Sequence, residues 1–227
     1  MVFSPHAELV GVMMEGAMGA ETTLKDDIAY MRGLAEDGRK GPVLGASILF
    51  SCGLIYSVAA VASWLIHSGR IAIDLPVVGA EWWAAAAIQI PTVIIMSKRL
   101  GGRRGQSNAS SKLFGIVWSA LGFTIFTLFV AIMLLAWRFE QPMVWMAMPA
   151  AVMALYGAGW SMNAAIVRRP WMHAVAGVSY LAAALTSFMI ELPNALGLLA
   201  YAGVIFAIIC VPGLILMREA VGGESRA

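Results

Sequence analysis

Charged residues are scarce in this chain of 227 residues: 12% are Asp, Glu, Lys or Arg, whereas 60% are hydrophobic. An average soluble domain is about 25% charged, so a chain this poor in charge cannot cover a surface that faces water. The net charge of +2 is too small to indicate a nucleic-acid partner. The composition therefore predicts an integral membrane protein, built as one helical bundle in a lipid bilayer.

Residues that bind metals are also scarce, with three histidines and two cysteines. Cys52 and Cys210 lie inside apolar runs, so the sequence has neither a disulfide framework nor a zinc-ribbon spacing. They fall at comparable depths and could meet if the first and last helices close the bundle. A haem needs two axial ligands at one depth. His67 falls at the outer end of the first predicted span and His173 at the inner end of the fifth, so they lie on opposite sides of the membrane, and His6 is in the N-terminal tail. We expect no metal site and no cofactor.

Charge is absent from the centre of every predicted span, because Glu81 and Glu191 fall near span ends. A proton-coupled transporter places a carboxylate near mid-membrane, and a retinal-type Schiff base needs a lysine there. The zinc-protease pattern HExxH is missing as well, and no nucleophile–base pair is visible. The sequence predicts no enzymatic activity.

Long apolar runs fill most of the chain. A membrane-spanning helix needs about 20 predominantly apolar residues, and six stretches qualify: 43–66, 76–96, 113–137, 143–167, 171–190 and 195–217. Short links follow the third and fifth stretches, so we expect antiparallel neighbours grouped as three hairpins. The predicted fold is an all-α polytopic membrane protein. Its six-helix bundle covers 43–217, between an N-terminal segment, 1–42, and a tail, 218–227.

Basic residues set the orientation of the spans. Only Arg70 and Arg138 fall on one side of the predicted bundle, whereas the other 13 of the 15 Lys and Arg residues fall on the opposite side. Positive residues mark the cytoplasmic side, so both termini are predicted to be cytoplasmic, in a multi-pass inner-membrane protein. Tryptophans favour the headgroup level, and their positions agree: Trp64, Trp82, Trp83, Trp137 and Trp145 fall near the outer boundary and Trp171 near the inner one.

A short amphipathic cytoplasmic helix is predicted at about 22–38. Thr23 and Asp26 resemble a capping box, Gly38 suits a C-terminal stop, and apolar residues recur at helical spacing between them. Acids and bases balance on this helix, which favours packing against protein over binding to an anionic leaflet. With the small residues that recur on later helices, such as Ala150, Ala154 and Ala158, it indicates a protein partner or a second copy of the chain.

Polar side chains inside the predicted spans are the candidate ligand-binding residues. They are Gln89, two residues before Pro91 in the second span, then Tyr156, Trp160 and Asn163 in the fourth, and Tyr180 in the fifth. The three residues of the fourth span recur at i, i+4 and i+7, which places them on one helix face. Gln89 and Tyr156 fall at nearly the same depth, in the cytoplasmic half. These residues line a small cavity for an amphipathic molecule, or they hydrogen-bond between helices and hold the bundle together.

The stretch DDIAYMRGLAEDGRKGPVLG, from Asp26 to Gly45, resembles the opening of small, mostly uncharacterised membrane proteins of alphaproteobacteria. The segment PGLILMREA, from Pro212 to Ala220, is a second similarity. The resemblance implies that the protein is located in a bacterial inner membrane. It does not imply any particular reaction or ligand.

These observations favour a non-enzymatic accessory, sensory or regulatory membrane subunit. The alternative is a small-solute transporter or a protein that binds an amphipathic ligand. The two differ in what the polar residues of the second and fourth spans do, because only the alternative needs a binding site among them.

Overall fold

The computed structural model describes residues 43–73, 79–100, 109–189 and 193–224. These ranges are almost entirely helical and contain no strand, so the predicted all-α fold is confirmed for them. They belong to one compact unit, 41–227. The predicted amphipathic helix at 22–38 lies outside the described residues.

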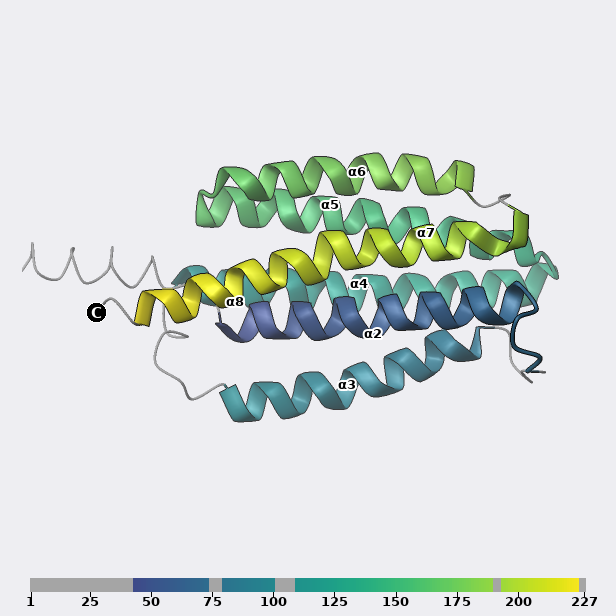
Figure 1. The fold of residues 1–227 in the computed structure, drawn as a ribbon, viewed down its shortest axis with the longest axis horizontal. Coiled ribbons are helices and arrows are strands. Elements are labelled where there is room, and N and C mark those ends of the chain that lie inside the picture. The colour runs from purple at the N-terminus through teal and green to yellow at the C-terminus, as the bar shows by residue number, and fades with distance from the viewer. Residues whose placement is uncertain (1–42, 74–78, 101–108, 190–192, 225–227) are drawn as a thin grey trace, which may run out of the picture. The chain divides into compact units, whose positions relative to one another are not determined.

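Six long helical segments follow one another in the described ranges. They are α2 (Val43–His67), α3 (Ala80–Leu100), α4 (Ala109–Phe139), α5 (Ala147–Val167, after the 3-10 turn Pro142–Met146), α6 (Pro170–Met189), and a last segment made of α7 (Leu196–Ile205), a π-helix (Phe206–Cys210) and α8 (Val211–Glu224), after the 3-10 turn Pro193–Ala195. Consecutive segments run in opposite directions, as Figure 1 shows. The last helix continues to Glu224, so residues 218–224 of the predicted tail are helical.

Five of these segments are long and apolar enough to cross a membrane: Gly45–His67, Lys112–Phe139, Met143–Val167, Pro170–Met189 and Leu196–Glu219. They correspond to five of the six predicted spans. The second predicted span is also helical, but α3 starts at Ala80 and continues to Leu100. It includes Glu81 at one end, Lys98 and Arg99 at the other, and Pro91 inside, and it is not among these five helices.

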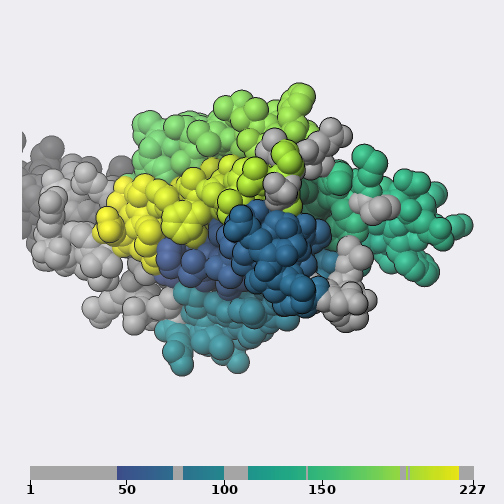
Figure 2. Space-filling view, turned by 45° about the vertical axis from the view of Figure 1, so that its right-hand side comes forward, coloured from purple at the N-terminus to yellow at the C-terminus, as the bar shows by residue number. Residues whose placement is uncertain are grey.

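Helix α2 occupies the middle of the bundle. It packs against α3 on one side and against α7, the π-helix and α8 on the other, and it also touches α4. Figure 2 shows α8, in yellow, between α6, in green, and α2, in blue. The contact with α8 is close because Gly213 has no side chain: a Cβ there would lie 3.0 Å from the backbone N of Phe50. Backbone-to-backbone approach of this kind needs glycine.

Helices α5 and α6 share the most extensive interface, although they belong to different predicted hairpins. Gly157 of α5 permits it, because a Cβ at this position would lie 2.7 Å from the ring of Tyr180 on α6. The contact between α6 and α7, the third predicted hairpin, is much smaller. A short link makes two consecutive helices antiparallel neighbours. Small residues on their facing surfaces decide how closely the two helices pack.

The two ends of the bundle carry different charge. The C-terminal ends of α3, α5 and α8 and the N-terminal ends of α4 and α6 lie at one end, which we call the basic end (Figure 1). These helix ends hold six of the eight described Lys and Arg residues: Lys98, Arg99, Lys112, Arg168, Arg169 and Arg218. The opposite end holds Arg70 and Arg138. The asymmetry that the sequence predicted is therefore also an asymmetry of the folded bundle.

Candidate functional site

Trp160 of α5 lies at the centre of the candidate site. Its side chain is fully buried, and its Nε1–H donates a hydrogen bond of 3.0 Å to the carbonyl oxygen of Ile208 in the π-helix. In a regular helix that carbonyl would accept from residue 212, but Pro212 has no N–H to donate. Trp160 supplies a donor from another helix, so this bond joins α5 to the π-helix. Single-turn π-helices are frequent at functional sites.

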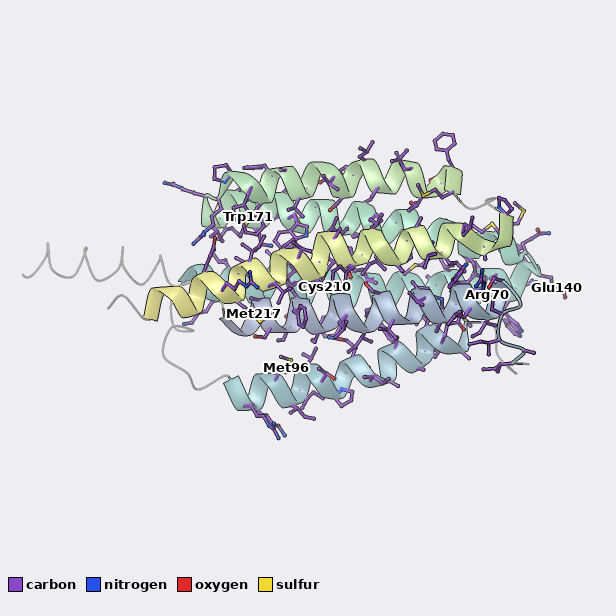
Figure 3. The ribbon with its side chains drawn as sticks, in the orientation of Figure 1. Arg70, Met96, Glu140, Trp171, Cys210 and Met217 are labelled. Atoms are coloured by element: carbon purple, nitrogen blue, oxygen red, sulfur yellow. The ribbon has the colours of Figure 1, made fainter. Side chains whose placement is uncertain are left out.

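Aromatic rings from two other helices contact Trp160. Its ring centroid lies 5.2 Å from that of Trp118 on α4, in an edge-to-face arrangement, and 6.0 Å from that of Trp171 on α6. Trp118 also contacts Phe114 and Tyr156, each at 6.0 Å. We call these five residues the tryptophan cluster. Figure 3 shows Trp171 at the start of α6, near the basic end of the bundle.

Three buried polar atoms in or beside this cluster have no hydrogen-bond partner among the described residues. The first two are Nε1 of Trp118, a donor, and Oδ1 of Asn163, an acceptor. Asn163 is fully buried one turn after Trp160, and its Nδ2 donates to the carbonyl of Gly159 at 2.8 Å. Nε1 of Trp171 is a third such atom. A buried group without a partner costs roughly 1–3 kcal/mol, so a molecule that bonds to these atoms gains free energy that the protein alone does not recover.

The structure brings together three of the five predicted ligand-binding residues. Tyr156, Trp160 and Asn163 are buried on one face of α5, as their spacing predicted. Tyr180 is 47% exposed, and its hydroxyl lies 3.4 Å from Oγ of Ser161, on the outside of the α5–α6 pair. Gln89 lies on α3, which packs against α2, and its Oε1 is buried without a partner among the described residues.

Both cysteines are free and lie where α2 meets its neighbours. Sγ of Cys210 is 3.7 Å from the carbonyl oxygen of Phe50, beside Gly53, so α2 and the last helical segment are adjacent. Sγ of Cys52 is 3.9 Å from the hydroxyl of Tyr156. Cys52 therefore borders the tryptophan cluster, whereas Cys210 packs against the backbone of α2. Figure 3 shows Cys210 near the middle of the last helical segment.

Trp118 and the π-helix are the parts of the site that sequence reasoning missed. A tryptophan within an apolar run looks like an ordinary core residue, so nothing in the span marked Trp118. Pro212 was a usable signal, because a proline inside an apolar run leaves the carbonyl four residues earlier without its donor. The donor that bonds to this carbonyl could not be predicted, because Trp160 lies 48 residues away from Ile208 in the sequence.

A second polar contact lies at the opposite end of the bundle. Ser63 of α2 is 1% exposed and donates a hydrogen bond to Oε1 of Glu81, in the first turn of α3. Oε2 of Glu81 is buried and has no partner among the described residues. Ser63 also accepts at its backbone carbonyl, which lies 2.8 Å from Nδ1 of His67. The sequence placed Glu81 near this end, but gave no sign that it bonds to α2.

We expect Ser63→Ala to lower the free energy of unfolding by about 1–3 kcal/mol, because the buried carboxylate loses its hydrogen-bond donor. Thermal unfolding of the purified protein in a neutral detergent measures the change. Ser187→Ala is the matched control, since Ser187 is exposed and bonds only within its own helix. Equal unfolding temperatures for the two variants would show that the contact between Ser63 and Glu81 does not stabilise the bundle.

No protein-family model matches the chain, and neither a curated protein nor a solved structure matches it. Among the described residues, no group of three or more His, Cys, Asp and Glu is placed to hold a metal ion.

Proposed function

We propose that this chain is a six-span bacterial inner-membrane protein that works without catalysis, as a sensory or regulatory subunit that binds a small amphipathic molecule. The observation that carries the proposal is the unsatisfied pair at the tryptophan cluster: a buried donor on Trp118 and a buried acceptor on Asn163. Native proteins leave few buried polar groups unpaired, and two of opposite kind at one cluster point to a missing partner.

The length and direction of α3 support a sixth span. Its 21 residues extend about 31 Å at 1.5 Å per residue, and a hydrocarbon core is about 30 Å thick. It runs antiparallel to α2 and packs against it. With six spans both termini lie on the same side, and the positive-inside rule makes the basic end cytoplasmic. The similarity of 26–45 to small alphaproteobacterial membrane proteins supports the inner membrane as the location.

The surroundings of the two unpaired atoms define the ligand. Aromatic rings of α4, α5 and α6 offer apolar surface, whereas Nε1 of Trp118 and Oδ1 of Asn163 require one acceptor and one donor. A molecule with an apolar ring or chain and a hydroxyl group meets both needs. Neighbouring side chains cover both atoms, so the ligand enters from the bilayer as α4 moves away from α5. Helix α4 is suited to that movement because it is the least buried of the five apolar helices.

The composition of the tryptophan cluster supports binding rather than catalysis. Its five residues are aromatic and include neither a histidine nor a carboxylate, and the polar groups beside it are one amide and the thiol of Cys52. General acid–base catalysis needs a side chain that exchanges protons near the working pH. An amide does not do so, and the hydroxyl of Tyr156 and the thiol of Cys52 belong to side-chain types that ordinarily titrate above neutral pH.

The test uses 2-naphthol, whose hydroxyl both donates and accepts, and 2-methylnaphthalene, which has no hydroxyl. We expect 2-naphthol to raise the unfolding temperature of the purified protein more than 2-methylnaphthalene at the same concentration. A ligand at ten times its Kd stabilises by about 1.4 kcal/mol. Trp118→Phe and Asn163→Leu should each abolish the difference between the two compounds, because each removes one polar partner.

Trp137→Phe is the control for this experiment. Trp137 is 78% exposed near the opposite end of the bundle, so its loss should leave the difference between the two compounds unchanged. The proposal fails if Trp118→Phe and Asn163→Leu respond to 2-naphthol as the unmodified protein does.

A further inference from the structure

Three arginines gather at the basic end, around the link between α5 and α6 and near the end of α8. Arg168 ends α5 in the left-handed conformation, with φ of 55°, and Arg169 follows it directly. Arg169 forms an ion pair with Glu219 of α8, and Arg218 is the residue before Glu219. Glu219 balances one of the three positive charges, so the group, which we call the arginine patch, keeps two.

The ion pair between Arg169 and Glu219 connects the two chain segments that carry Arg168 and Arg218. The side chains of Arg169 and Glu219 are 30% and 34% exposed, so the pair is partly shielded from water. Arg168 and Arg218 are exposed, and neither has an ion-pair partner among the described residues. Their charges are therefore open to solvent or lipid, next in sequence to the two residues of an ion pair that joins the α5–α6 link to α8.

Apolar surface begins directly beside the arginine patch. Trp171, two residues after Arg169, is half-buried against Trp160, and indole rings favour the headgroup level of a membrane. Further along α6 and α8 several exposed side chains are apolar: Val178 is 53% exposed, Val211 41% and Ile215 38%. The patch therefore lies at the boundary between headgroups and hydrocarbon.

We propose that the arginine patch binds the headgroup of an anionic phospholipid, with its phosphodiester between Arg168 and Arg218 and its acyl chains along α6 and α8. The guanidinium group presents a planar set of donors that matches phosphate geometry, and basic sites between helices on the cytoplasmic side bind anionic headgroups. The adjoining apolar surface favours a lipid over a free phosphate. This inference does not depend on the ligand of the tryptophan cluster.

The experiment compares dioleoyl phosphatidylglycerol with dioleoyl phosphatidylcholine, added to the purified full-length protein in a neutral detergent. We expect phosphatidylglycerol to raise the unfolding temperature at lower concentration than phosphatidylcholine. The double variant Arg168→Gln, Arg218→Gln should weaken the response to phosphatidylglycerol roughly 30-fold, because each basic residue near the surface contributes to anionic-lipid binding. Its response to phosphatidylcholine should not change.

Two controls separate this site from a general effect of charge. The double variant Arg70→Gln, Arg138→Gln removes the same charge from the opposite end and should keep the full response to phosphatidylglycerol. Inorganic phosphate at millimolar concentration should not stabilise the protein.

An unchanged response in the Arg168 and Arg218 double variant would overturn the proposal, and so would stabilisation by phosphate alone equal to that by phosphatidylglycerol. If the double variant does not fold, Arg218→Gln alone should weaken the response about fivefold. An unweakened response in this single variant would overturn the proposal in the same way.

Discussion

Replacing Gly213 by leucine is expected to lower the free energy of unfolding by about 3 kcal/mol, in the upper range for overpacked cores. A Cβ at this position would lie 3.0 Å from N of Phe50, 3.2 Å from Cα of Phe50 and 3.2 Å from O of Ala46. All three are backbone atoms of α2, so no side-chain rotation relieves the contact. Helix α8 must move away from α2, and the whole interface loosens.

Gly203→Leu is the matched control for Gly213→Leu. Gly203 lies on α7 in the same helical segment, and a Cβ there meets nothing within 4 Å. The measurement is the unfolding free energy of each variant in detergent, obtained by titration with a denaturing detergent. If both leucine variants lose the same stability, the close approach of α8 to α2 is not what makes glycine necessary at position 213.

Replacing Trp160 by alanine is expected to destabilise the bundle by about 3–5 kcal/mol, the usual range for truncating a buried aromatic residue. The side chain is fully buried, and it contacts the rings of Trp118 and Trp171. The variant also removes the donor that bonds to the carbonyl of Ile208. The loss is measured by the same denaturation experiment.

Trp160→Phe separates the hydrogen bond from the packing of the ring. Phenylalanine keeps an aromatic ring but cannot donate, so the buried carbonyl of Ile208 loses this bond, and we expect a loss of about 1–3 kcal/mol. Trp118→Phe is the control, because Nε1 of Trp118 bonds to nothing among the described residues. If Trp160→Phe is no more destabilising than Trp118→Phe, the bond to the π-helix contributes nothing to stability.

The helices could be predicted well because the signal for a membrane span is local. An apolar run of sufficient length forms a helix in lipid whatever its neighbours are, since every backbone polar group must bond within the segment. Helix α3 was the difficult case, because its first turn contains the charged residue Glu81. One oxygen of that carboxylate accepts a hydrogen bond from Ser63 of another helix. A contact of this kind does not show in the hydropathy of one segment.

The candidate site could be predicted only in part. The spacing of Tyr156, Trp160 and Asn163 placed them on one face of α5, because helical periodicity is fixed. Depth in the membrane is also readable from sequence, and it put Gln89 level with Tyr156. Depth does not say which face of a helix points inward or which helix lies beside it. Gln89 lies on α3, and α3 packs against α2 rather than against α5, the helix of Tyr156.

The position of α2 has a consequence for how the protein is made. Helix α2 packs against the last helical segment, and Gly53 and Gly213 are the residues that allow the two to come close. Helices that enter a bilayer one after another associate only when their partners are present. In a bilayer we therefore expect this face of α2 to stay exposed to lipid until residues 196–224 have been inserted. We expect a chain that stops before residue 196 to leave this face of α2 uncovered, because α7, the π-helix and α8 are the segments that pack on it.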